Sequence, residues 1–349
     1  MHVVYTPQHK LHATDAVQVE GHAFETEEVP ARAEIILAAT QAAGLGTIVA
    51  PADHGLAPIL AVHDADYLTF LQTVHDESAA YFGQAGAVLA WSFATRHAIR
   101  KPGGFLGLKG YYTFSWGTPI LEGTWQAAYW SAQCALTAAD RLQAGEQAVY
   151  ALCRPPGHHA AADLYGGSCF LNNAAIAARH LQNAPNRSAE RAGGVKIAIL
   201  DVDYHHGNGT QAIFYTDPSV LYCSLHAHPD EAFPYFWGGD DEPGEGPGHG
   251  SNRNWPLPLK TDDAHYLAAL DEALAAIQAF APHYLVVSAG FDTLAGDPVG
   301  GFDVTLDGLR QIGQRLAGLG LPTLIVQEGG YLLEKLGAGA VAFLQPFVP

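Results

Sequence analysis

Four short polar clusters in the sequence carry the residue types that a hydrolytic metal centre needs. They are residues 154–159 (RPPGHH), 201–209 (DVDYHHGNG), 289–292 (AGFD) and 328–331 (EGGY), and each directly follows an apolar run. Carboxylates and imidazoles can bind a divalent metal ion. A histidine or tyrosine beside such an ion can move a proton or donate a hydrogen bond to an oxyanion. The four clusters together are far more specific than any one of them.

The second cluster spaces Asp201, Asp203 and His205 two residues apart. Side chains at alternate positions of an extended segment share a face, so these groups can point the same way. One histidine and two carboxylates suit Zn²⁺ or another divalent transition metal, and Asp292 can supply the third ligand. Asp201 is then free to orient a histidine as an outer partner. The alternative for the triplet alone is an ordinary acidic loop with a solvated histidine.

His158 and His159 form a tandem pair on a Pro-Gly turn, and Tyr331 follows two glycines. Beside a metal, the two imidazoles could take a proton from water and pass it to a leaving amine. The phenol of Tyr331 could donate to a developing oxyanion. Each feature also has a structural alternative, because tandem histidines and buried tyrosines often serve only packing.

The elements that must position these clusters alternate between strands and helices. The sequence predicts strands at 2–5, 47–50, 148–153, 196–202, 220–225, 284–288 and 322–327. It predicts helices at 31–43, 64–75, 123–143, 172–182, 263–280, 306–318 and 332–344. This alternation is typical of an α/β fold with a mostly parallel sheet, and the continuous apolar strands indicate helices on both faces. Ligands of such sheets bind at the carboxyl ends of strands, so the four clusters should form one site.

We expect a single domain over residues 1–349, since no linker or break in composition divides the chain. Residues 78–122 form an aromatic-rich, glycine-rich segment with weak periodicity, which predicts a functional loop insertion or an interface. A plain surface excursion is the alternative for this segment.

The composition of the chain disfavours some classes of binding partner and indicates its cellular location. The formal charge of -18 disfavours binding to nucleic acid or to an anionic membrane surface. The four cysteines lack C-x-x-C spacing and lie among apolar residues, as reduced buried thiols do. No signal peptide or membrane-spanning run is visible, so the expected location is cytoplasmic.

Taken in order, residues 154–159, 167–173 (GSCFLNN), 201–209 and 328–331 resemble the signature blocks of the histone deacetylase superfamily. The resemblance is strongest to bacterial acetylpolyamine amidohydrolases and histone deacetylase-like amidohydrolases, and it extends over nearly the whole chain. It implies an arginase–deacetylase fold and hydrolysis of an N-acyl amine by metal-activated water.

The resemblance assigns roles to individual residues. It implies that Asp203, His205 and Asp292 hold a catalytic Zn²⁺, with Fe²⁺, Co²⁺ or Mn²⁺ as possible substitutes. His159, partnered by Asn208, would be the base and then the acid. His158, paired with Asp201, would assist electrostatically, and Tyr331 would stabilise the oxyanion. A structural K⁺ is also implied, held by side chains or backbone carbonyls of Asp201, Asp203, His205, Ser224 and Leu225.

The same resemblance implies that segment 78–122 builds a homodimer interface, or one of a higher even oligomer, near the mouth of a substrate tunnel. Polyamine-cleaving relatives place two glutamates in this segment, whereas Leu106 and Gly117 occupy the matching positions here, with Lys101 and Lys109 nearby. Ser168 replaces an aromatic tunnel wall next to Gly167, while Phe233 and Val299 line the rest. An apolar contact cannot replace a charge-assisted bond to an ammonium. N-acetylputrescine is therefore predicted to react more slowly than a neutral or aromatic amide, including xenobiotic amides.

Two other functions share part of this pattern. A binuclear manganese ureohydrolase needs a further carboxylate two residues after Asp292, where the sequence has Leu294. If the protein were a non-catalytic acetyl-amide binder, at least one of the site residues would be expected to be missing, and all of them are present.

Overall fold

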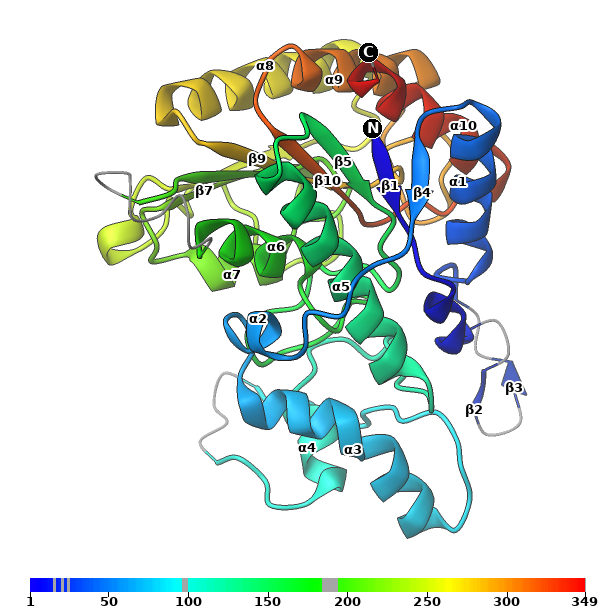
Figure 1. The fold of residues 1–349 in the computed structure, drawn as a ribbon. Helices are drawn as coiled ribbons and strands as arrows, with labels where there is room; N and C mark the ends of the chain where they lie inside the picture. The colour runs from blue at the N-terminus through cyan, green and yellow to red at the C-terminus, as the bar shows by residue number, and fades with distance from the viewer. Residues whose placement is uncertain (15–16, 20–21, 24–25, 96–99, 184–193, 349) are drawn as a thin grey trace.

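Eight parallel strands form the central sheet of the computed structural model, which describes residues 1–14, 17–19, 22–23, 26–95, 100–183 and 194–348 (Figure 1). In the order in which they lie across the sheet, the strands are β4 (Thr47–Val49), β1 (His2–Val4), β5 (Ala148–Ala151), β10 (Thr323–Gln327), β9 (Tyr284–Ala289), β6 (Ile197–Asp201), β7 (Val220–Ala227) and β8 (Asn252–Leu257). A separate antiparallel pair consists of β2 (Gln18–Val19) and β3 (His22–Ala23).

Helices lie on both sides of the sheet. One side carries α1 (Ala31–Ala42), α8 (Asp263–Phe280), α9 (Leu306–Ala317) and α10 (Leu333–Leu344) (Figure 1). The other side carries α5 (Thr124–Gln143), α6 (Asn173–Gln182) and α7 (Asn208–Phe214). Beyond α5 lie α2 (Ala57–Leu60), α3 (Ala65–Phe82) and α4 (Phe105–Tyr111). The predicted single-domain α/β fold with a helix-covered parallel sheet is confirmed.

The inner strands of the central sheet contribute to two hydrophobic cores because their side chains alternate between faces. In β6, Ile197 and Ile199 pack into the core under α5 and α6, while Ala198 and Leu200 pack into the core under α8 and α10. All four residues are fully buried. This two-sided burial explains why the strand sequences are continuously apolar instead of alternating.

Polar side chains cap the starts of some of the helices that follow strands. The side chain of Asn172 caps α6 by accepting from the N–H of Ala175, and Thr305 caps α9 by accepting from Gly308. Such caps satisfy backbone N–H groups that have no partner within the helix. They set where each helix begins relative to the strand end before it.

Segment 78–122 is more regular than its weak periodicity predicts. Helix α3 continues to Phe82, well past residue 75, and ends at Gly83 in the left-handed region with φ 72°. Helix α4 occupies residues 105–111 within the segment. Segment 78–122 is therefore not a loop throughout, because it holds the end of one helix and the whole of another. Its role as a functional insertion or an interface stays a prediction.

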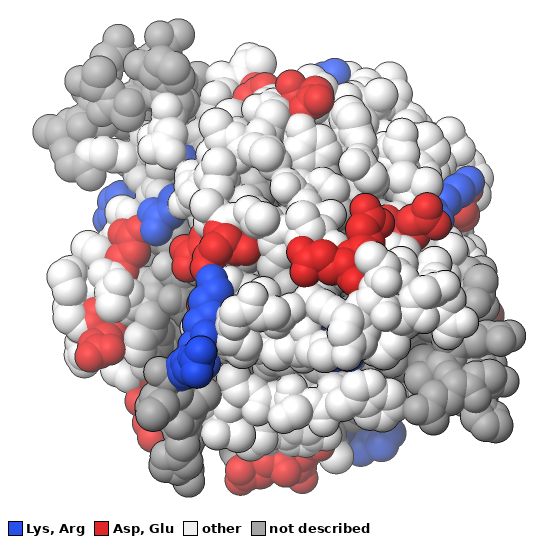
Figure 2. Space-filling view, turned by 90° about the horizontal axis from the view of Figure 1, so that it is seen from below, with Lys and Arg blue, Asp and Glu red and all other residues white. Residues whose placement is uncertain are grey.

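The face that includes α3 and α4 is mostly uncharged, with separate acidic clusters and few basic side chains (Figure 2). Several aromatic side chains of segment 78–122 are exposed, among them Tyr81, Phe82, Trp91 and Trp116. Among the residues that the structure describes, no helix combines the length and apolarity needed to cross a membrane.

Candidate active site

The four polar clusters converge because the strands before them are neighbours. Strands β5, β10, β9 and β6 lie side by side in that order, and all run in the same direction. Their carboxyl ends therefore open at one edge of the sheet, where ligands of parallel sheets bind. The predicted metal-binding, proton-transfer and oxyanion residues meet at this edge.

The predicted metal ligands Asp203, His205 and Asp292 lie together. Each offers one donor atom, and the three atoms are within 4.8 Å of one another. Nδ1 of His205 lies 3.2 Å from Oδ1 of Asp203 and 3.1 Å from Oδ2 of Asp292. Both carboxylates are fully buried. The three side chains are close enough to hold one metal ion, which is the role that the resemblance predicts for them.

The electrostatics of these three residues fit a cation. Burial and the neighbouring Asp203 raise the pKa of Asp292 to about 7. Burial disfavours a charged imidazole at His205, but its hydrogen bonds to Asp203 and Asp292 outweigh that effect and raise its pKa to about 9. Two buried carboxylates this close repel each other unless positive charge lies between them. A divalent ion bound by one nitrogen and two oxygens would supply that charge.

Backbone groups hold the carboxylates in place. The N–H of Gly329 donates to Oδ2 of Asp203 at 2.8 Å, and the N–H of Tyr204 donates to Oδ1 of Asp292 at 3.0 Å. A Cβ at position 329 would collide with both carboxylates. Gly329 is therefore required for close approach of the backbone to the metal ligands.

The tandem histidines have different partners and opposite pKa shifts. Nδ1 of His158 lies 3.1 Å from Oδ2 of Asp201, and Nδ1 of His159 lies 2.8 Å from Oδ1 of Asn208. Although burial opposes it, the carboxylates of Asp203 and Asp201 raise the pKa of His158 to about 10. Burial and the neighbouring His158 hold the pKa of His159 well below its usual value.

These shifts separate the roles of the two rings. A neutral His159 can accept a proton, whereas a charged His158 cannot; it can stabilise negative charge or donate a proton. The amide oxygen of Asn208 only accepts hydrogen bonds, so Nδ1 of His159 carries the hydrogen and Nε2 is the free acceptor.

Tyr331 is fixed by contacts on its ring and on its backbone. The guanidinium of Arg32 lies 4.4 Å from the ring centroid, within range for a cation–π contact. Oδ2 of Asp297 accepts from the N–H groups of Tyr331 and Leu332 at 2.7 and 2.9 Å. Burial raises the pKa of the Tyr331 phenol well above its usual value, so the hydroxyl keeps its proton and can donate it in a hydrogen bond.

A pocket of about 170 Å³ joins these groups to the surface. Its walls are His159, Gly167, Ser168, His205, Phe233, Val299 and Tyr331 together with Thr26, Glu27 and Glu28. Such a volume is well below the roughly 300–1,000 Å³ of a pocket for a drug-sized ligand. The predicted substrate residues Gly167, Ser168, Phe233 and Val299 thus surround the same space as the catalytic groups.

The other two predicted substrate residues, Leu106 and Gly117, are not among the residues that line this pocket. Leu106 lies on α4 and is 47% exposed. Segment 78–122 nevertheless contacts the pocket wall, since Thr118 accepts a hydrogen bond from the N–H of Ser168 at 3.0 Å and Phe114 stacks on Phe233 with ring centroids 5.7 Å apart.

Two of the residues predicted to hold K⁺, Asp201 and Ser224, lie on adjacent strands of the sheet. They are register partners on β6 and β7, and both are fully buried. The carboxylate of Asp201 accepts from the hydroxyl of Tyr222 at 3.0 Å, and Ser224 contacts Nδ1 of His226 at 2.8 Å.

Several positioning residues were not predicted from the sequence. Oε2 of Glu328 accepts from the N–H groups of Gly157 and His158 at 2.7 and 3.1 Å, which fixes the turn that carries the two histidines. Arg32 donates to the carbonyl oxygens of Glu328 and Gly330. Glu328 belongs to a cluster that the sequence identified, but nothing near Arg32 or Asp297 in the sequence indicates these distant partners.

The fold and the arrangement of His159, His205 and Tyr331 around one small pocket fit a hydrolase of amide bonds, and Asp203, His205 and Asp292 beside it could hold a metal ion. Residues 26–346 match the histone deacetylase domain, and the chain belongs to the histone deacetylase family.

The chain is similar to characterised relatives over nearly its full length. It is 44% identical to acetylpolyamine amidohydrolase 1 of Pseudomonas aeruginosa, an alignment that covers 99% of this chain and 98% of the relative. Identity to the acetylpolyamine amidohydrolase of Mycoplana ramosa is 43%, with 99% of each chain covered. The crystal structure of acetylpolyamine aminohydrolase from Burkholderia pseudomallei superposes with a TM-score of 0.90 at 42% identity, covering 99% of this chain and 98% of that one.

Proposed function

We propose that this chain is a zinc-dependent amidohydrolase that cleaves the C–N bond of small N-acyl amines, as an acetylpolyamine amidohydrolase-like enzyme. The observation that carries the proposal is that His159, His205 and Tyr331 all face the same pocket of about 170 Å³. A base, a metal ligand and an oxyanion donor around one acyl-sized space are the parts that amide hydrolysis needs.

Asp203, His205 and Asp292 would hold the Zn²⁺, and Fe²⁺, Co²⁺ or Mn²⁺ could substitute. When bound, zinc supplies Lewis acidity and lowers the pKa of a coordinated water. Leu294, which stands where a binuclear site needs a carboxylate, is 2% exposed and packs in the apolar core. This supports one catalytic ion per site.

Side chains of the protein carry out the proton transfers and stabilise the charges that develop during hydrolysis. Nε2 of His159 takes a proton from the attacking water and later returns it to the leaving amine. His158, held by Asp201, offsets the negative charge that develops beside it. The hydroxyl of Tyr331 donates to the oxyanion formed from the substrate carbonyl, a contact that strengthens as the charge grows. Asn208 keeps the ring of His159 in the required tautomer.

The identity of the amine depends on groups beyond the acyl pocket. The names of the relatives favour an acetylated polyamine, and the exposed carboxylate of Glu27 at the pocket could receive an ammonium. A neutral or aromatic amine, including one from a xenobiotic amide, is favoured by Leu106 and Gly117 in the place of the expected acids. Lys101 pairs with Asp66 and Lys109 is buried, so neither contributes charge to the pocket wall.

Segment 78–122 is proposed to form a homodimer interface, or part of a higher even oligomer. Its exposed aromatic residues Tyr81, Phe82, Trp91 and Trp116 are types enriched at such interfaces. A structural K⁺ is proposed beside the zinc site, held by the side chains of Asp201 and Ser224 and by carbonyls of Asp203, His205 and Leu225. All four cysteines are free, buried thiols, which supports the expected cytoplasmic location.

The proposal is tested by measuring acetate release from N-acetylputrescine and from acetanilide, a neutral aromatic amide. We expect hydrolysis of both classes, with the neutral amide ahead in kcat/KM. The reverse ranking would indicate a polyamine substrate and would point to Glu27 as the group that binds its ammonium. In that case Glu27→Gln should lower turnover of N-acetylputrescine but not of acetanilide. Absence of acetate release from the whole panel would contradict the proposed function.

A further inference from the structure

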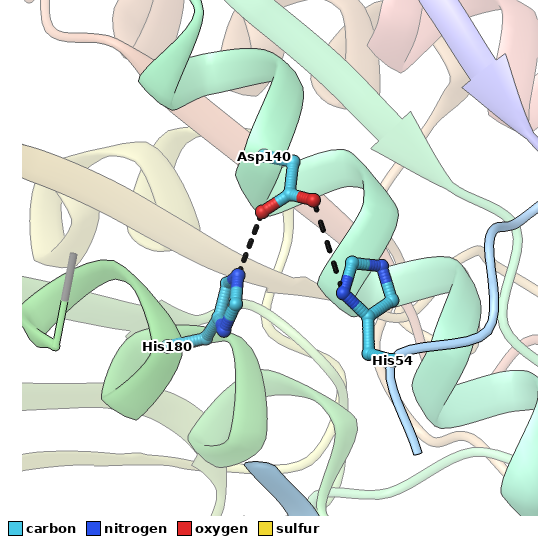
Figure 3. A group of neighbouring side chains, drawn as sticks. All are labelled: His54, Asp140 and His180. Atoms are coloured by element: carbon cyan, nitrogen blue, oxygen red, sulfur yellow. Dashed lines mark hydrogen bonds and ion pairs between the residues drawn. The ribbon is translucent and has the colours of Figure 1, made fainter. Parts of the chain in front are cut away.

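A further group of side chains that could hold a metal ion lies where α5, α6 and the connection before α2 meet, apart from the pocket. His54 lies on the connection between β4 and α2, Asp140 on α5 and His180 on α6 (Figure 3). One donor atom from each residue lies within 4.8 Å of the others. None of the three lines the pocket that contains Tyr331.

Both oxygens of the Asp140 carboxylate face an imidazole. Nε2 of His180 lies 2.7 Å from Oδ1, and Nδ1 of His54 lies 3.8 Å from Oδ2 (Figure 3). The two imidazole rings lie edge to face, with centroids 5.6 Å apart. Two nitrogens and one carboxylate therefore surround the same small space from three separate elements.

The connection that carries His54 is fastened to α5. The N–H of His54 donates to Oε1 of Gln133 at 2.7 Å, and the N–H of Ala52 donates to Oγ1 of Thr137 at 2.9 Å. Gln133, Thr137 and Asp140 all belong to α5. His54 is thus held beside Asp140 by backbone contacts that do not involve its own ring.

The hydrogen-bond partner of Nε2 of His54 leaves the other ring nitrogen, Nδ1, available to bind a metal ion. Nε2 of His54 lies 3.2 Å from Oγ1 of Thr137. When Nε2–H donates to this hydroxyl, Nδ1 carries a lone pair that faces Oδ2 of Asp140. Two facing acceptors repel each other, and a cation between them removes the repulsion. Histidine ligands of metals commonly donate their other N–H in this way.

We propose that His54, Asp140 and His180 form a second binding site for a divalent transition metal, for which Zn²⁺ is the natural probe. Two imidazoles and a carboxylate are ligands that suit such ions and not Ca²⁺ or Mg²⁺. Bonds of about 2.0–2.2 Å require small rotations of the three side chains. Asp140 is 49% exposed, so water can complete the coordination. A bound ion would join the β4–α2 connection to α5 and α6.

The test is zinc bound per chain, measured by mass spectrometry after equilibration with micromolar Zn²⁺ and gel filtration. We expect two ions in the wild type, one in His180→Gln and one in Asp292→Asn. The Asp292→Asn/His180→Gln double variant should bind none. His265→Gln is the matched control, because His265 contacts a single carboxylate, Asp262, at 2.7 Å on an exposed surface. This control should keep both ions.

A second readout tests the site without the catalytic ion. In the Asp292→Asn background, Zn²⁺ should raise the melting temperature, and His54→Gln or His180→Gln should abolish that rise. Thr137→Val should weaken zinc binding roughly 10–100-fold, as loss of an outer partner does. Wild-type protein with one zinc ion per chain, or full zinc binding by correctly folded His180→Gln, would overturn the proposal. Amide hydrolysis by His180→Gln should match the wild type, which separates this site from the catalytic one.

Discussion

Nδ1 of His159 lies 2.8 Å from the side-chain oxygen of Asn208, whereas the neighbouring His158 has a carboxylate, Asp201, as its partner. Burial and the neighbouring His158 lower the pKa of His159, which favours the neutral ring that can accept a proton, and the uncharged amide of Asn208 does not reverse this. The carboxylate favours a charged His158. This difference in partners distinguishes the base from its electrostatic neighbour, although the two rings lie only 4.0 Å apart between centroids.

Asn208→Asp tests this relationship through pH dependence. A carboxylate beside Nδ1 favours the imidazolium, so it raises the pKa of His159 from its present low value. Because His159 acts as a base only when neutral, the acidic limb of the kcat/KM profile should move to higher pH. An exposed Asn183→Asp change, which adds the same charge elsewhere, should leave the profile in place. A profile for Asn208→Asp that is unchanged or moves to lower pH would refute the assignment of His159.

Tyr331→Phe removes the hydroxyl that faces the pocket and keeps the ring that packs under Arg32. Loss of one oxyanion donor should lower kcat roughly 100–1,000-fold, with a much smaller change in KM and the same zinc content. Steady-state kinetics beside a metal assay measure all three quantities. Wild-type turnover by the variant would remove Tyr331 from the mechanism.

Asp297→Asn tests whether Asp297 holds the turn that carries Tyr331. Asp297 accepts from three backbone N–H groups, those of Val299, Tyr331 and Leu332. An amide offers only one oxygen and presents a donor toward one of these N–H groups, so unfolding stability should fall by about 1–3 kcal/mol. The kcat value should fall as well, because the turn that carries Tyr331 is less well held. Urea denaturation with the exposed Asp230→Asn as control checks the stability. No loss relative to that control would show that Asp297 does not hold the turn.

Much of the active site was predictable because its residues follow buried strands. Ile197–Asp201 and Tyr284–Ala289 are apolar and continuous, so their ends, and the polar residues after them, could be located from the sequence. The edge strand Asn252–Leu257 was missed, because it contains polar residues and Pro256 and has a partner on one side only.

The residues that were missed act through tertiary contacts. Arg32 lies on α1, nearly 300 positions before Glu328 and Gly330, to whose carbonyl oxygens it donates. Glu28 is buried between Arg32, four residues later in the chain, and Arg154, which is 126 positions away and has no local signal in the sequence. Long-range pairs of this kind become visible only when the fold brings the segments together. The site on His54, Asp140 and His180 belongs to the same class, since its ligands come from three distant elements.

Zinc content and acetate release, measured on the same samples of wild type and Asp292→Asn, test the central claim most directly. Asp292 is one of three predicted catalytic ligands, and both of its carboxylate oxygens already contact site groups. The variant should lose one zinc ion per chain relative to the wild type, and acetate release should fall to the uncatalysed level. Acetate release at the wild-type rate by a variant that has lost that ion would contradict metal-dependent hydrolysis at Asp203, His205 and Asp292.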